Sequence, residues 1–261
     1  MTQFYLTLPS NSSMNFYPNN TVTRYTTRLQ TPISLSGEWE VGLFEIQYPH
    51  SWYNLQNDEN RIMYKQDGKR QVDIYLPPGT YESAPRLMDE INVRISGVAT
   101  KLGVDKFPVF QYNNLTKRMT ATIRKDTYVN FSKTLATMLG VDAHQNPIGH
   151  EMEIDLPWKS NNACDVHRGF NSMYVYCDLL EHVPVGDTRA PLLRIVNVCG
   201  NSGESINRNY DKPQYVPLQK KNFESLEIDI RTDAGNPVPF EFGKVVVTLH
   251  FRLCKSPYFL Q

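Results

Sequence analysis

The last part of the chain alternates between two sets of residues with a period of two, from Lys244 to Leu253. One set is apolar and consists of Val245, Val247, Leu249 and Phe251. The other set is Val246, Thr248, His250 and Arg252, and it becomes polar in its second half. Because successive side chains of a strand point to opposite faces of the sheet, this segment predicts a strand with one face in an apolar core. We expect the other face, with His250, to lie in solvent.

Short segments rich in aromatic and β-branched residues fill both ends of the chain, separated by clusters of Pro, Gly, Asn and Asp. This pattern predicts an all-β sandwich. Besides the last strand, the expected strands are Phe4 to Leu8, Val22 to Leu29, Trp39 to Tyr48, Arg61 to Lys65, Gln71 to Leu76, Met173 to Leu180, Leu192 to Val198, Gln214 to Leu218 and Ser225 to Arg231. About ten strands suffice for two facing four-stranded sheets with spare edges, and a jelly roll accommodates an insertion in one of its long connections.

The middle of the chain shows helical periodicity instead. Ser83 can cap a helix over residues 84–95, which has leucine, methionine and isoleucine on one face. A shorter helix is predicted over 132–139, where Gly140 ends it. Between the two helices, residues 109–112 and 119–123 flank a turn-like Asn-Asn pair and predict a hairpin.

These patterns together predict a mainly β fold. We expect an antiparallel single jelly-roll sandwich formed by residues 1–78 and 156–261, with an α+β insertion over residues 79–155 between two of its strands. The pair Asp67-Gly68 predicts a hairpin turn inside the first sandwich segment.

Charge is balanced along the chain, with 27 Lys and Arg, 27 Asp and Glu, and no run of one sign. Direct binding to nucleic acid through a generally basic surface is therefore not indicated. The opening residues lack a basic start followed by an apolar core, and no segment approaches the roughly 20 apolar residues that a spanning helix needs. We expect a soluble, non-secreted protein with no membrane span.

Four cysteines are widely spaced, lie in or beside apolar segments and show no C-x-x-C pattern: Cys164, Cys177, Cys199 and Cys254. In a chain that folds in a reducing compartment, buried free thiols are the simplest interpretation.

Signatures of common catalytic sites are absent from the sequence, including Gly-rich phosphate loops, G-x-S-x-G and H-E-x-x-H. Histidines occur at positions 50, 144, 150, 167, 182 and 250. The closest pair, His144 and His150, has a spacing that fits neither a helical face nor a zinc hairpin. Asp165, His167 and Cys177 resemble parts of a Cys-His nucleophilic site, but such sites are defined by geometry rather than by proximity in sequence. We assign no catalytic, cofactor-binding or metal-binding residues and expect a protein that is not an enzyme.

Two further features suggest binding, each with a simpler structural interpretation. The basic pairs Lys69-Arg70 and Lys220-Lys221 lie in predicted turns, where solvated surface lysines are common. A group of aromatics along the early strands could stack on sugars, but it could equally supply the core of a sandwich: Trp39, Phe44, Trp52 and Tyr53.

Four stretches together carry a resemblance to a known family: FYLTLPSNSSMNFYPNNT, GEWEVGLFEIQYPHSWYNL, LPPGTYES and SLEIDIRTDAGNPVPFEFGKVVVTLHFR. The chain resembles the minor capsid, or penton, proteins of Maverick/Polinton elements and adintoviruses, and the resemblance covers almost its whole length. It implies a single jelly-roll subunit that forms homopentamers at the fivefold vertices of an icosahedral capsid, beside a major capsid protein of the double jelly-roll type. It also implies location in the virion, with synthesis in the host cytosol and assembly there or in the nucleus. It carries over no catalytic residue and no cofactor.

Two alternatives remain open at the level of sequence. A major capsid, or hexon-type, jelly-roll protein of this lineage needs two jelly rolls in each chain, and the predicted strands make only one. A carbohydrate-binding or receptor-binding β-sandwich module is suggested by the aromatics and by the loops at each end of the sandwich.

Overall fold

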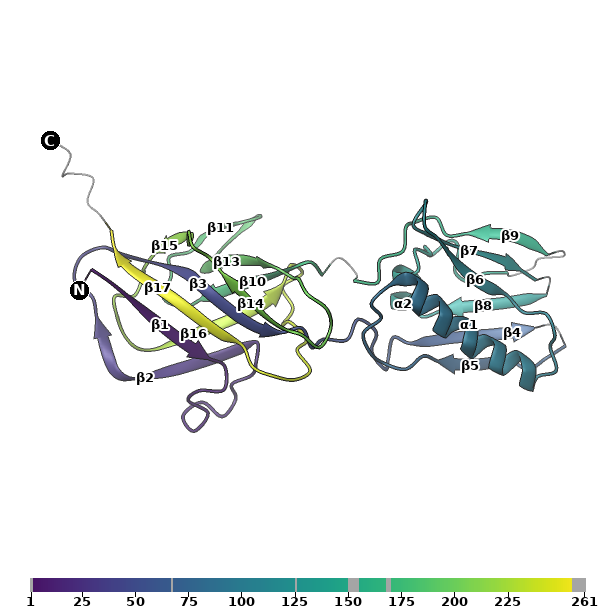
Figure 1. Ribbon diagram of the computed structural model, residues 1–261, viewed down its shortest axis with the longest axis horizontal. Helices are drawn as coiled ribbons and strands as arrows, with labels where there is room; N and C mark the ends of the chain where they lie inside the picture. Colours follow the sequence, from purple (N-terminus) through teal and green to yellow (C-terminus); the bar gives the residue numbers. More distant parts are fainter. Residues whose placement is uncertain (1, 67, 125, 150–154, 168–169, 255–261) are drawn as a thin grey trace. The chain divides into compact units, whose positions relative to one another are not determined.

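The computed structural model describes residues 2–66, 68–124, 126–149, 155–167 and 170–254. The chain divides into two compact units (Figure 1). The sandwich unit is formed by Met1–Trp52 and Phe170–Gln261, and the inserted unit by Tyr53–Gly169. Each unit has its own cluster of buried apolar side chains.

The sandwich unit contains two antiparallel sheets. The first sheet has the order β1-β17-β3-β14, in which β1 is Gln3–Pro9, β17 is Val246–Leu253, β3 is Trp39–Pro49 and β14 is Ser205–Asn209, and β15 (Tyr215–Pro217) also pairs with β3. The second sheet has the order β13-β10-β16-β2, in which β13 is Leu192–Asn197, β10 is Ser172–Cys177, β16 is Asn222–Thr232 and β2 is Arg24–Ser34. A small hairpin joins β11 (Val183–Val185) to β12 (Thr188–Ala190). The prediction of a mainly β, antiparallel jelly-roll sandwich is confirmed.

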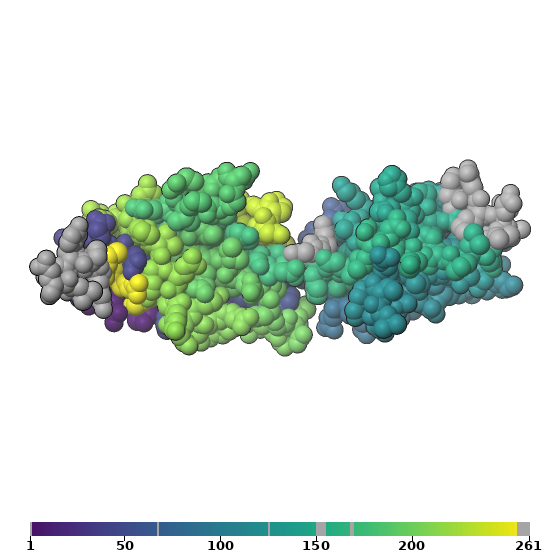
Figure 2. All heavy atoms as spheres, turned by 90° about the horizontal axis from the view of Figure 1, so that it is seen from above, coloured from purple at the N-terminus to yellow at the C-terminus, as the bar shows by residue number. Residues whose placement is uncertain are grey.

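Alternation along the strands builds the core between these two sheets. The apolar set of β17 predicted from the sequence, Val247, Leu249 and Phe251 among it, is fully buried. The second sheet contributes its own alternate residues, such as Val175 and Ile228. The first and last strands of the chain lie side by side in this unit, where purple and yellow surfaces adjoin (Figure 2).

One polar group bridges the two sheets inside the core. The Tyr25 hydroxyl on β2 donates a hydrogen bond of 3.1 Å to the carbonyl oxygen of Leu8 on β1. Burial raises the pKa of Tyr25, so the hydroxyl stays protonated and keeps donating.

The inserted unit contains two three-stranded antiparallel sheets and two helices. One sheet has the order β5-β4-β8, with β5 at Val72–Tyr75, β4 at Arg61–Gln66 and β8 at Thr127–Phe131. The other has the order β6-β7-β9, with β6 at Val109–Asn113, β7 at Arg118–Ile123 and β9 at Leu156–Lys159. Helix α1 is Ala84–Lys101 and helix α2 is Lys133–Met138.

Helix α1 begins and packs as its sequence predicts. The Ser83 side chain accepts a hydrogen bond from the backbone N–H of Arg86, which satisfies one of the free donors of the first turn. The helix buries a stripe of residues in the core of the inserted unit, namely Leu87, Met88, Ile91, Ile95 and Ala99. The predicted hairpins are also present, as the pairs β4–β5 and β6–β7.

The compact units divide the chain at positions other than the predicted boundaries of 1–78, 79–155 and 156–261. Strands β4 and β5, predicted as sandwich strands, belong to the inserted unit because β4 pairs with β8 on its other side. Strand β9 belongs there as well because it pairs with β7. The inserted unit therefore spans Tyr53–Gly169.

We predict that the sandwich unit folds without the inserted unit. The residues at the junction, Trp52 and Phe170, pack edge to face with ring centroids 5.1 Å apart, so a short Gly/Ser linker can replace residues 53–169. The linker should change the loop-closure free energy by only about 1 kcal/mol. We expect a soluble variant with one cooperative urea transition, measured by circular dichroism.

A second deletion serves as the control. Replacing residues 79–155 alone leaves β4 and β5 without β8, and it uncovers Ile62 and Tyr64, which are now fully buried. That variant should aggregate or unfold without cooperativity. If the 79–155 deletion folds and the 53–169 deletion does not, the division at Tyr53 and Gly169 is wrong as a folding boundary.

Candidate interaction surfaces

Residues that the sequence singled out as a Cys-His group lie in different surroundings. Cys177 belongs to the core of the sandwich unit, where burial raises the pKa of its thiol to about 12. Asp165 and His167 belong to the inserted unit. There the Asp165 carboxylate accepts a hydrogen bond of 2.9 Å from the backbone N–H of His167. That bond is a local turn contact.

Other histidines also have structural surroundings. His50 is buried and stacks on Trp52, with ring centroids 4.2 Å apart. His144 is exposed, and its backbone N–H donates to Asp142. His150 lies outside the described residues. Within the described ranges, no group of three or more His, Cys, Asp or Glu side chains could hold a metal ion, and neither helix has the length and apolar character needed to cross a bilayer.

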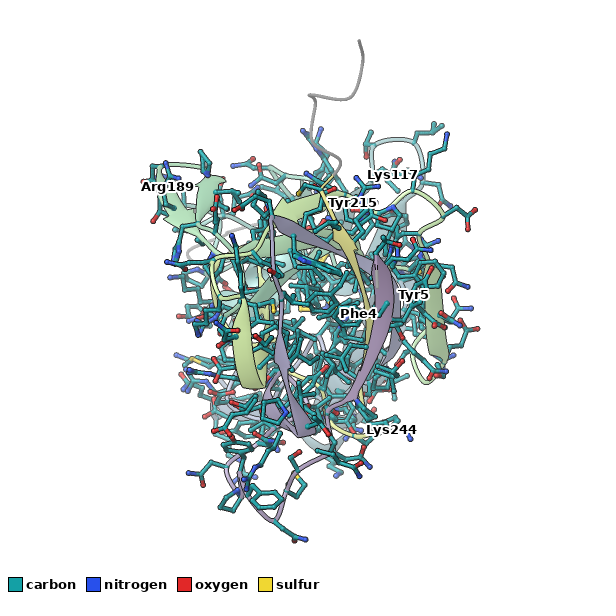
Figure 3. All side chains as sticks on the ribbon, turned by 90° about the vertical axis from the view of Figure 1, so that its left-hand side faces the viewer. Phe4, Tyr5, Lys117, Arg189, Tyr215 and Lys244 are labelled. Atoms are coloured by element: carbon teal, nitrogen blue, oxygen red, sulfur yellow. The ribbon has the colours of Figure 1, made fainter. Side chains whose placement is uncertain are left out.

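The prediction that His250 faces solvent is wrong. Only 7% of His250 is exposed, although it lies on the sheet face opposite the core. The strand register places Tyr5 and Tyr215, which are labelled in Figure 3, on either side of it. The Tyr5 ring stacks on the imidazole with centroids 4.5 Å apart, and the Tyr215 hydroxyl lies 2.7 Å from His250 Nδ1. A row of aromatic rings therefore covers this imidazole.

A glycine in β3 explains how this row forms. The sheet register places Gly42 between Tyr215 of β15 and His250 of β17. A Cβ atom at Gly42 would lie 2.8 Å from the side chain of Pro213, so only glycine lets the segment before β15 lie on the sheet. The missing side chain leaves room for Tyr215 to reach across to His250.

Predicted binding aromatics do not form one platform. Trp39 and Trp52 are members of the sandwich core, as the simpler interpretation proposed. Phe44 lies on the other face of the same sheet and contacts Tyr5 edge to face at 4.9 Å between centroids. Lys220 and Lys221 form ion pairs with Asp178 at 2.7 Å and with Glu38 at 2.6 Å. Both are partly exposed ion pairs of small energetic consequence.

The loop over residues 10–20, which lies between β1 and β2, is held by side-chain hydrogen bonds. The Asn20 amide donates to the carbonyl of Thr26 and accepts from its backbone N–H, each at 2.9 Å. Ser13 accepts from the backbone N–H of Arg28 at 3.0 Å. We call this segment the 10–20 loop.

The 10–20 loop presents apolar side chains to solvent. Phe16 is 60% exposed, Met14 is 43% exposed, and the guanidinium of Arg28 lies over the Phe16 ring at 4.6 Å. A rigid loop loses little conformational entropy when it binds, so an exposed aromatic on it suits contact with another protein. Phe16 could be recognised in the sequence as an aromatic residue. The hydrogen bonds that fix the 10–20 loop could not be predicted from the sequence.

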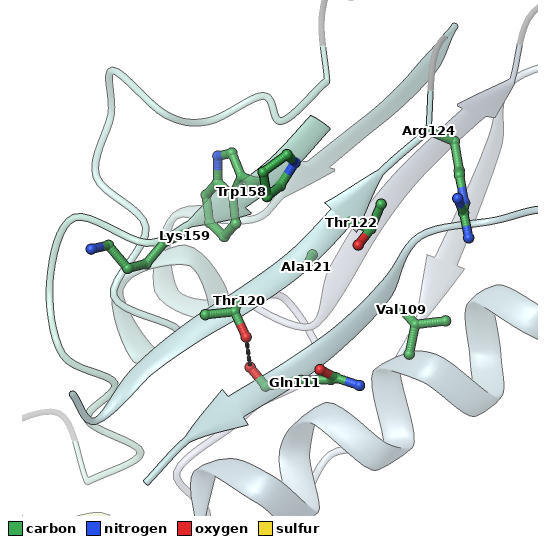
Figure 4. A pocket seen from close by; sticks show the side chains of 9 residues that line it. Val109, Gln111, Thr120, Ala121, Thr122, Arg124, Trp158 and Lys159 are labelled. Carbon is green, nitrogen blue, oxygen red and sulfur yellow. Dashed lines mark hydrogen bonds between the residues drawn. The ribbon is translucent and has the colours of Figure 1, made fainter. Parts of the chain in front are cut away.

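A second surface is a pocket of about 470 Å³ on the inserted unit, which we call the β7 pocket (Figure 4). It lies on the face of the β6-β7-β9 sheet opposite the core of the unit. Its principal side chains are Val109, Gln111, Thr120, Thr122, Pro157 and Lys159. Arg124, at the end of β7, completes the lining. The sequence predicted the hairpin β6–β7 but not the pairing of β9 that completes this pocket.

Comparison with known proteins identifies relatives by structure only. No family model and no curated protein sequence matches the chain. A crystal structure of the mavirus penton protein is similar with a TM-score of 0.53 and 10% sequence identity, covering 96% of this chain and 99% of that one. A cryo-EM structure of the Sputnik virophage gives a TM-score of 0.49 and 10% identity, covering 97% of this chain and 98% of that one. The chain thus shares the fold of the mavirus penton protein over nearly its full length.

We predict that all four cysteines are free thiols that differ in reactivity. They are unpaired in the structure. Alkylation of the unfolded, unreduced protein should add four labels by mass spectrometry. In the native protein Cys177 should react last, because it is buried and burial raises its pKa to about 12, whereas Cys254 is partly exposed. Two protected cysteines in the unfolded sample would reveal a disulfide and contradict the prediction.

We predict that His250 makes folding stability depend on pH. Burial, and then the charge of Arg252, lower the pKa of His250 from 6.5. The unfolded chain therefore binds a proton at a higher pH than the folded chain. Neutral His250 contributes its full share to the free energy of unfolding above the pKa of the unfolded chain, and this contribution declines as pH falls below it. The His250→Gln side chain cannot titrate. At neutral pH this substitution should lower the free energy of unfolding by roughly 1 to 2 kcal/mol, because it alters the hydrogen bond to Tyr215.

Urea unfolding across this range tests the prediction. The stability difference between the wild-type protein and His250→Gln should shrink as pH falls from about 7.5 to about 5. His182→Gln is the matched control, because His182 is exposed in the same unit. A difference that stays constant with pH would show that His250 titrates normally.

Proposed function

We propose that the chain is a structural protein of a virion, the minor capsid (penton) subunit at the fivefold vertices of an icosahedral capsid. The observation that carries the proposal is the likeness to the mavirus penton protein, which covers 96% of this chain and so includes both units. A sandwich alone would support many functions. A structural match that also includes the inserted unit is compatible with fewer functions.

The arrangement of sheets favours the vertex protein over the hexon-type alternative. Among the described residues, one unit is a sandwich of two large sheets, whereas the inserted unit has two three-stranded sheets with helices. A double jelly-roll protein requires two sandwiches in one chain. We therefore propose such a protein as the neighbour in the shell rather than as the identity of this chain, and we propose a role without catalysis.

The proposed assembly is a homopentamer within the virion, formed after synthesis in the host cytosol. A ring of identical subunits needs a heterologous contact, in which two different surfaces of one chain meet. The 10–20 loop offers an apolar surface for one side of that contact. A pocket of about 270 Å³ in the same unit, lined by Tyr176, Ala190 and Pro191 among others, offers a surface for the other.

We predict that the purified protein associates into pentamers at high concentration and that Phe16→Asp prevents this. Five copies of 30.1 kDa give about 150 kDa, which analytical ultracentrifugation distinguishes from a trimer. Removing an exposed aromatic anchor should weaken association by about 10-fold to 100-fold. The thermal transition should hardly change, because Phe16 is 60% exposed.

Leu115→Asp is the matched control, since Leu115 is 94% exposed on the inserted unit. It should associate like the wild-type protein. Stable trimers, or a threefold position in reconstructed particles, would refute the proposed function. Pentamers that persist in Phe16→Asp would refute only the role of the 10–20 loop.

A further inference from the structure

The β7 pocket combines a polar row with a partly apolar row on one sheet face (Figure 4). Strand register places Gln111, Thr120 and Lys159 opposite one another in one row. Val109, Thr122 and Pro157 form the next row. Val109 is 43% exposed and contributes apolar surface to this row.

Several polar groups of the pocket lack partners among the described residues. The Thr120 hydroxyl donates to the Gln111 carbonyl at 3.3 Å. The side chains of Gln111, Thr122 and Lys159 make no hydrogen bond or ion pair with the described part of the chain. They therefore present an amide, a hydroxyl and an ammonium group to a ligand.

Arg124 adds a directed donor at the end of the pocket. Its Nη1 atom pairs with the Asp155 carboxylate at 2.8 Å. Its Nε atom is buried and has no partner among the described residues. A buried donor without a partner costs free energy. Because Nε is covered, a ligand would meet the exposed part of the Arg124 side chain, which is 32% exposed.

These groups define the chemistry of the ligand. Hydroxyl and amide groups beside an apolar row match a sugar ring, which has hydroxyls on its edge and C–H groups on its faces. Among the described residues that line the pocket, the cations are Arg124 and Lys159. Arg124 pairs with Asp155, so Lys159 supplies one further positive charge for an anionic group. A volume of about 470 Å³ is within the range of small-molecule sites.

We infer that the β7 pocket binds an acidic saccharide, one that carries a carboxylate or a sulfate group. The proposal stands apart from assembly, because all of its residues belong to the inserted unit. Carboxylated and sulfated sugars share the anionic chemistry that the pocket recognises, and the experiment separates them.

The test measures binding of three probes to the full chain by calorimetry and by saturation-transfer NMR. The probes are 3′-sialyllactose, a sulfated heparin disaccharide and neutral lactose. At least one acidic probe should bind at least about tenfold more tightly than lactose, because charge-assisted hydrogen bonds contribute roughly that factor. Binding should weaken as salt is raised, since part of it is electrostatic between partly exposed charges.

Variants assign the binding to the pocket. Lys159→Glu should reduce the affinity for the acidic probe at least about tenfold, and Thr122→Val, which removes only a hydroxyl, should reduce it several-fold. Lys244→Glu changes the net charge equally but lies on the sandwich unit (Figure 3), so it should bind like the wild-type protein. Circular dichroism confirms that each variant is folded, and Lys159→Gln replaces Lys159→Glu if that variant is not.

Backbone amide shifts provide a readout that does not depend on substitution. The acidic probe should move the resonances of Thr120, Thr122 and Lys159 in the wild-type protein. Equal binding of lactose and the acidic probes, an equal loss in Lys244→Glu, or no binding of any probe would overturn the inference.

Discussion

Hydrogen bonding between the first and last strands is the constraint on which the sandwich depends. The register joins Gln3 to Arg252 and Pro9 to Val246, so β1 becomes the edge of a sheet whose next strand comes from the other end of the chain. Phe4 and Phe251 stack across this pair with centroids 4.7 Å apart. Strand β17 then pairs with β3, and β3 aligns β14 and β15. Because β1 and β17 are far apart in sequence, a unit inserted between them must leave the sandwich and return to it at neighbouring points.

The inserted unit satisfies this constraint at a single junction. The chain leaves the sandwich unit at Trp52 and re-enters it at Phe170, and these two rings contact each other. Trp52 also packs edge to face against Phe240, with centroids 5.7 Å apart. Both ends of the insertion are therefore fixed by aromatic packing that belongs to the sandwich core. The length of the inserted unit then adds little to the free energy of loop closure, because loop-closure entropy grows only with the logarithm of loop length.

Residue periodicity in the sequence predicted the positions of the strands and helices well, but it did not predict which strands pair with each other. The alternation in β17 and the stripe of α1 depend on local sequence, so both could be predicted. The partner of β4 is β8, which lies beyond a helix and a hairpin, and the pattern of Arg61 to Gln66 says nothing about which strand it will meet. The error at His250 has the same origin, since alternation tells which face a residue occupies but not whether another segment covers that face. Here Gly42 leaves room for Tyr215 of β15 to cover it. The two candidate surfaces were missed because they depend on hydrogen bonds and pairings between distant residues.

Because each unit has its own core, surface residues of one unit can change without affecting the packing of the other. In the proposed pentamer every subunit would make the same contacts with its neighbours, so a change in an interface surface would be repeated at each interface. The inserted unit has its own core, in which Tyr64, Leu87 and Phe110 are fully buried, and substitutions on its outer sheet face leave that core intact. Gln111, Thr122 and Lys159 can therefore change without affecting the sandwich. Positions of this kind are where a structural protein can gain recognition of a ligand at little cost in stability.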